Sequence, residues 1–112
     1  MSKLAQLIAQ REGYGIAGDI PTTHNNPGDL EHAPGETHDT GSPIGEFIDP
    51  SAGWAALEGQ LQKYADRGLT MQQMTYIYAP PTENDTDGYL DFLCQGLGCQ
   101  PDTSVKDALL IT

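Results

Sequence analysis

The sequence predicts one small α+β domain, residues 1–112, that is mainly helical. Apolar residues recur at helical spacing over most of the chain. Residues 17–49 differ, because they are rich in Gly, Pro, Thr, His and Asp and have few apolar positions. A length of 112 residues suits a single domain with a modest core. We therefore expect helices around one core and a polar segment that lines a cleft.

The first helix is predicted to run from about Lys3, because apolar residues follow at i, i+3 and i+4. These positions are Leu4, Leu7 and Ile8. Gly13 and Gly15 are stop signals beyond its end. Glu12 is therefore expected in the last helical turn.

The position of Glu12 has a chemical consequence. The carbonyls at a helix C-terminus carry partial negative charge, which disfavours a carboxylate there. If the side chain is also shielded from water, both effects raise its pKa and favour the protonated acid. A glutamic acid that stays protonated near neutral pH can protonate the leaving oxygen of a glycosidic bond. The alternative is a solvated glutamate paired with Arg11 or Lys3.

Asn25, Asn26, Pro27 and Gly28 predict a tight turn. Asn26 precedes proline and is therefore pushed to an extended conformation, and Pro27-Gly28 suits the centre of a turn. The two amides match the hydroxyl and N-acetyl groups of amino sugars. They can equally tie down the backbone of the turn itself.

The polar segment, residues 17–49, is expected to be a cleft-lining loop with one or two short strands. The best candidate strand is Ile44 to Ile48. The segment also offers candidates for a second catalytic carboxylate, although a transglycosylase needs none because the N-acetyl group of the substrate can assist. The candidates are Asp19, Asp29, Glu31, Glu36, Asp39 and Glu46.

The same segment holds residue types that bind zinc or a hard cation. They are His24, Glu31, His32, Glu36, His38 and Asp39. Their spacing matches no established metal motif, and loop histidines are more often exposed than ligating. We therefore predict no metal and no cofactor, and keep a metal-dependent hydrolase as a minority alternative.

The clearest helix is predicted to begin at Pro50 and Ser51 and to end at Gly68. Its apolar stripe is Trp54, Leu57, Leu61 and Tyr64. Because Trp54 shares this stripe, we expect it in the core and not as a platform for a sugar ring.

Three further helices are predicted from their capping signals. The start signals are Thr70 with Gln73, then Asp85 or Thr86, then Asp102, Thr103 or Ser104. The stop signals are Pro80 and Pro81 for the first helix and Gly96 or Gly98 for the second.

Cys94 and Cys99 are spaced for a small disulfide loop or two free thiols, and we favour a structural role, with a disulfide only outside the cytosol.

The charge of the chain limits its partners. Its 16 acidic and 5 basic residues give a net charge of −11, which argues against binding to nucleic acid or to anionic membranes.

No apolar run approaches membrane-spanning length, and the start of the chain does not read as a signal peptide. We expect a monomer made in the cytoplasm that reaches the cell wall after release by lysis, by a holin or with a virion.

Four motifs in order resemble a family of small phage and bacterial proteins. They are REGYG, IPTTHNNPGDL, GEFIDPSAGWAALEGQLQKYADRGLT and YAPPTENDTDGYLDFL, and the resemblance covers Glu12 to about Thr103. Members are often labelled phage structural protein or lysozyme-like protein. The family is similar to the lysozyme and lytic transglycosylase superfamily, whose general acid is a glutamate ending the first domain helix. The resemblance implies a compact lysozyme-like domain in which a small β-hairpin walls the cleft.

The resemblance also implies roles for individual residues. It places Glu12 in the position of the catalytic acid. It places the following residues near the cleft as substrate contacts: Asn25, Asn26, Tyr78, Glu83 and Asn84. The chain departs from the NNPGNLR pattern of the family, because Asp29 and Glu31 stand where members often have an asparagine and a basic residue.

The predicted function is cleavage of peptidoglycan glycan strands. A muramidase (lysozyme) or a lytic transglycosylase would act on the β-1,4 bond between N-acetylmuramic acid and N-acetylglucosamine, with Glu12 as general acid. The alternative is a non-catalytic glycan-binding or virion structural protein on the same fold, which the net charge favours slightly.

Overall fold

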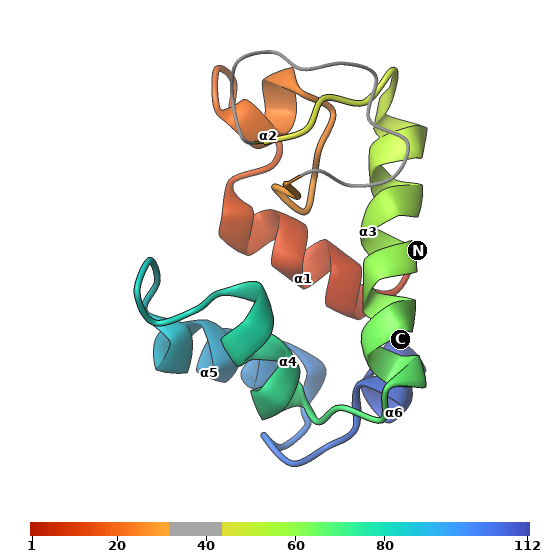
Figure 1. Ribbon diagram of the computed structural model, residues 1–112, viewed down its shortest axis with the longest axis vertical. Coiled ribbons are helices and arrows are strands. Elements are labelled where there is room, and N and C mark those ends of the chain that lie inside the picture. Colours follow the sequence, from red (N-terminus) through yellow and green to blue (C-terminus); the bar gives the residue numbers. More distant parts are fainter. Residues whose placement is uncertain (32–43) are drawn as a thin grey trace. The chain divides into compact units, whose positions relative to one another are not determined.

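Figure 1 shows the computed structural model, which describes residues 1–31 and 44–112. These residues form two compact units, each considered by itself below: an N-terminal unit (Ala5–Gln60 with Met1) and a C-terminal unit (Leu61–Thr112 with Ser2–Leu4). The described chain is mainly helical, as predicted. The helices are α1 (Lys3–Glu12), α2 (Ile20–Thr23), α3 (Pro50–Asp66), α4 (Met71–Tyr78), α5 (Thr86–Leu97) and α6 (Val105–Leu109).

Helix α1 confirms the first predicted helix and its end. Its buried face consists of Leu4, Ala5, Ile8 and Ala9. The helix ends at Glu12, and Gly13 follows with a φ of +90°, a conformation that glycine adopts most readily. The amide of Tyr14 donates to the carbonyl of Ala9 at 3.0 Å, which is the bond that closes a helix end of the Schellman type.

The polar segment differs from its prediction. It contains the short helix α2. Within this segment, strand-type pairing of the described residues is limited to one bridge between Glu31 and Ile44. Residues 32–43 lie outside the described residues, and the expected β-hairpin is not confirmed.

The predicted strand Ile44 to Ile48 is wrong, and its hydrogen bonds give the reason. The amide of Gly45 donates to the carbonyl of Leu30, and the amide of Phe47 donates to the carbonyl of His24, both at 2.9 Å. The carbonyls of Gly45 and Phe47 accept from asparagine side chains instead of a second strand. Residues 45–47 therefore bond to the backbone and to the asparagine side chains of the 24–31 stretch, and do not form the regular backbone ladder of a strand pair.

Helix α3 has the predicted extent, but a different residue caps it. The carboxylate of Asp49 accepts from the amide of Ala52 at 2.8 Å, which makes Asp49 the capping group. Leu57, Leu61 and Tyr64 are buried, as expected of the stripe. Trp54 is half-buried, so it lies at the edge of the buried stripe and not fully inside the core.

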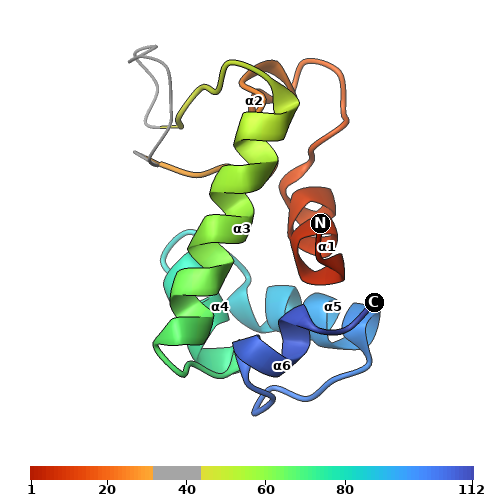
Figure 2. The same cartoon turned by 90° about the vertical axis from the view of Figure 1, so that its right-hand side faces the viewer.

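Figure 2 shows α4, α5 and α6 of the C-terminal unit. All three begin at predicted caps. Thr70 and Gln73 form both bonds of a capping box, Asp85 caps α5, and Ser104 caps α6. Gly98, with a φ of +71°, ends α5. Large side chains that are fully buried in these helices include Met71, Met74, Leu93 and Val105.

One further property of the described helices concerns membranes. None of the helices in residues 1–31 and 44–112 is both long enough and apolar enough to cross a bilayer.

Candidate functional site

The predicted site residues fall into two groups. Glu12, Asn25 and Asn26 belong to the N-terminal unit. Tyr78, Glu83 and Asn84 belong to the C-terminal unit. The geometry of each group follows from its own unit.

Glu12 is held at the C-terminal end of α1, a helix with a buried face. It is the last residue of α1, and its side chain is half-buried. The carboxylate of Asp19 lies against the next residue, because a Cβ placed on Gly13 would be 2.8 Å from Asp19 Oδ2. The side chain of Asp19 makes no capping bond to α2 although it stands at the capping position. Of the candidates for a second carboxylate, Asp19 is therefore the one that the described contacts place beside the neighbour of Glu12.

An aromatic pair lies near Glu12 in sequence. The rings of Tyr14 and Trp54 meet edge to face, with centroids 5.4 Å apart. Both side chains are half-buried, so each keeps part of its surface in contact with solvent. Such a pair offers apolar ring surface together with a hydroxyl and an indole N–H, the combination common at binding surfaces. Sequence reasoning missed this contact, because Trp54 has the spacing of a core residue.

Asn26 is the first residue of the hydrogen-bonded turn. Its side chain is 0% exposed. Its amide nitrogen donates to the carbonyls of Leu30 and Gly45, and its amide oxygen accepts from the amide of Leu30, all at 2.9 Å. The amide of Asp29 donates to the carbonyl of Asn26 at 3.0 Å and closes the turn around Pro27 and Gly28. Asn26 thus performs the backbone-fixing role that the sequence left open as an alternative to sugar binding.

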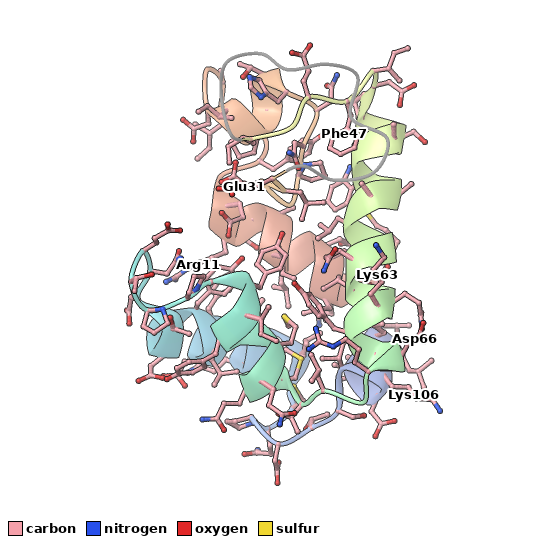
Figure 3. All side chains as sticks on the ribbon, viewed as in Figure 1. Arg11, Glu31, Phe47, Lys63, Asp66 and Lys106 are labelled. Carbon is pink, nitrogen blue, oxygen red and sulfur yellow. The ribbon has the colours of Figure 1, made fainter. Side chains whose placement is uncertain are left out.

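Asn25 joins the same network from a left-handed backbone conformation. Its φ is +52°, and its amide nitrogen donates to the carbonyl of Phe47 at 3.0 Å. Figure 3 labels Glu31 and Phe47, which belong to the two stretches that these asparagines connect. The two adjacent asparagines therefore fix the path of residues 44–47 against residues 24–31.

The turn also rests directly on α3. A Cβ placed on Gly53 would lie 1.8 Å from the carbonyl oxygen of Asn25 and 2.9 Å from Pro27 Cδ. Only a residue without a side chain permits this approach of two backbones. Sequence reasoning missed this role, although a glycine inside a helical pattern is itself a signal of close packing.

Three titratable residues of the 24–31 stretch interact with one another: His24, Asp29 and Glu31. Burial, and then the charge of Glu31, raise the pKa of the Asp29 carboxyl, while His24 acts in the opposite direction. Asp29 has a left-handed backbone with a φ of +53°. Nδ1 of His24 is buried without a hydrogen-bond partner. These residues combine a carboxyl that burial favours in its protonated form with an unused imidazole nitrogen.

Replacing Asp29 by asparagine is expected to stabilise the fold more at pH 7 than at pH 3. A carboxyl whose pKa is raised on folding opposes folding once it ionises, and the penalty disappears at low pH, where folded and unfolded forms are both protonated. Asparagine keeps the shape and tolerates a positive φ. Urea unfolding of both proteins at the two pH values measures the difference. An equal change in unfolding free energy at pH 3 and pH 7 would contradict this account.

In the C-terminal unit, Tyr78 packs against Tyr64. Their rings meet edge to face at 6.5 Å between centroids, and Tyr78 is half-buried. Glu83 and Asn84 are exposed in the turn that follows α4, where both amides donate to the carbonyl of Pro80. The exposed carboxylate and amide remain accessible to a ligand.

A metal site was a minority alternative. Among residues 1–31 and 44–112, no three His, Cys, Asp or Glu side chains lie close enough to hold a metal ion. His32, Glu36, His38 and Asp39 fall outside these residues. Glu46 and Glu31, the other described candidates for a second carboxylate, lie on the two stretches joined by the asparagines.

Comparison of the chain with protein-family models, with curated proteins and with solved structures finds no match.

Proposed function

We propose that the chain is a peptidoglycan-cleaving glycosidase, a muramidase or a lytic transglycosylase, with Glu12 as its general acid. The observation that carries the proposal is the setting of Glu12, which ends α1, is half-buried and has the carboxylate of Asp19 against the following residue. A helix fixed by a buried face positions a catalytic group more precisely than a loop does.

In this mechanism Glu12 protonates the glycosidic oxygen as the bond to the anomeric carbon breaks. Positive charge then develops on the sugar ring. A carboxylate nearby stabilises this charge, and Asp19 is our candidate. In a transglycosylase the N-acetyl group of the substrate takes over the opposite face of the sugar.

Replacing Asp19 by asparagine tests its part in this scheme. We expect a loss of roughly tenfold in the rate of cleavage, since removal of one nearby charge raises the barrier by about 1.4 kcal/mol. The side chain makes no capping bond, so the thermal midpoint should stay the same. Initial rates of muropeptide release by folded variant and wild type measure the effect. An unchanged rate would remove Asp19 from the mechanism.

The remaining proposed glycan contacts are Asn25, Tyr78, Glu83 and Asn84, with Asn26 assigned to fixing the turn. Tyr14 and Trp54 add ring surface within the N-terminal unit. Trp54 is the only tryptophan of the chain, so quenching or a spectral shift of its fluorescence on titration with N-acetylglucosamine oligomers reports on sugar binding at this pair.

A second candidate function is a non-catalytic glycan-binding or virion structural role. The net charge of −11 favours it, because bacterial cell walls are usually polyanionic and an acidic enzyme is repelled from them. Incubation of the protein with purified peptidoglycan separates the two functions. Soluble muropeptides would support the enzyme, whereas co-sedimentation with intact peptidoglycan and no release of fragments would support the binding role.

A further inference from the structure

Two free thiols meet at the C-terminus of α5. Cys94 is only 7% exposed and Cys99 is half-buried. The amide of Cys99 donates to the carbonyl of Cys94 at 3.0 Å, and the Cys99 thiol is near enough to raise the pKa of the Cys94 thiol. Both cysteines belong to the C-terminal unit, and neither is among the residues proposed for glycan cleavage.

The helix end explains why these two side chains are neighbours. Gly98 has a left-handed backbone, and its amide and that of Cys99 both donate to the carbonyl of Cys94. This arrangement brings the third residue from the helix end into contact with the second residue beyond it, and an apolar pair usually fills that contact. Here both positions are cysteines. The backbone therefore holds two thiols together whether or not they are bonded.

We propose that Cys94 and Cys99 form a reversible disulfide by exchange with a small-molecule disulfide such as glutathione disulfide. This intramolecular disulfide would form when the protein leaves a reducing compartment. It needs little movement, because the two thiols are neighbours and the main chain between them is already closed by a hydrogen bond.

The exposure of the two thiols sets the order of the exchange. The Cys99 thiol loses its proton to solvent, and its sulfur attacks one sulfur of glutathione disulfide, whose S–S bond breaks to release one glutathione. The Cys94 thiol then loses its proton, attacks the Cys99 sulfur and releases the second glutathione. Two protein thiols are oxidised while one glutathione disulfide is reduced to two thiols. Burial, with Cys99 second, raises the pKa of the Cys94 thiol to about 12, so the second attack is the slower one at neutral pH.

The disulfide would stabilise the segment of the C-terminal unit that contacts the start of α4. The segment after Cys99 accepts hydrogen bonds from the start of α4, because Met71 donates to Thr103 at 2.8 Å and Gln72 donates to Pro101 at 2.9 Å. A covalent bond at the head of this segment limits its freedom in the unfolded chain. We expect the thermal midpoint of the oxidised protein to exceed that of the reduced protein by about 5 °C.

The experiment uses the full chain, reduced, freed of reductant and then incubated in glutathione buffers of rising oxidised fraction. Alkylation of free thiols followed by intact mass spectrometry measures the fraction that carries an internal disulfide. The expected result is a monomer that has lost two hydrogens, forms faster as the pH rises from neutral, returns fully on reduction and shows the higher thermal midpoint.

Alanine variants separate exchange from simple packing. Cys94→Ala should accumulate a stable mixed disulfide with glutathione at Cys99, because the resolving thiol is missing. Cys99→Ala should stay unmodified while folded, because Cys94 is buried. A wild type that stops at the mixed disulfide, or that forms the internal bond with no gain in thermal midpoint, would overturn the proposal.

Discussion

Replacing Glu12 by glutamine is expected to lower the rate of peptidoglycan cleavage by at least about a hundredfold, the usual contribution of a general acid. Glutamine keeps the size and hydrogen-bonding shape of the side chain but cannot give up a proton. The effect should appear in kcat, because the proton is needed in the transition state and not for binding.

The control is the fold of the variant. Glu12 is the last residue of α1 and glutamine matches it in size, so the thermal midpoint should stay within a few degrees of wild type. Fluorescence titration with N-acetylglucosamine oligomers should give similar affinities for both proteins. Equal cleavage rates for wild type and variant would show that another residue supplies the proton.

Replacing Gly53 by alanine is expected to destabilise the protein by about 3 kcal/mol or more. The new methyl group would stand 1.8 Å from the carbonyl oxygen of Asn25, and that oxygen belongs to the backbone and cannot rotate away. Either α3 or the turn must move, which disturbs the buried hydrogen bonds of Asn26. Urea unfolding followed by circular dichroism measures the loss.

The same helix provides a matched control. A Cβ placed on Gly59 meets no atom within 4 Å, and this residue also lies inside α3. Gly59→Ala should therefore stabilise the protein by up to about 1 kcal/mol, because alanine is the better helix former. If both variants are stabilised, the turn does not rest on α3 at Gly53.

The helices could be predicted because their signals are local. The capping box of Thr70 and Gln73 specifies the start of α4 by itself, and Gly98 specifies the end of α5. Helix α2 was missed, although Asp19 followed by Ile20-Pro21 is a start signal with proline in the first turn. A helix of one turn has too few apolar positions for periodicity to reveal it.

The polar segment could not be predicted in the same way, because its structure depends on partners distant in sequence. The side-chain amide of Asn26 donates to the carbonyls of both Leu30 and Gly45. No residue near Gly45 in the sequence indicates that bond. The sequence identified the turn but left two roles open for its asparagines. The contact of Gly53 with Asn25 and that of Tyr14 with Trp54 are also long-range, and each required the structure.

The measurement that tests the central proposal most directly is digestion of purified peptidoglycan by wild type and Glu12→Gln from acid to neutral pH, with products identified by mass spectrometry. We expect disaccharide muropeptides from wild type and none from the variant. Products lighter by one water would identify a transglycosylase. No cleavage by folded wild type at any pH would contradict the enzyme assignment and favour the binding or structural role.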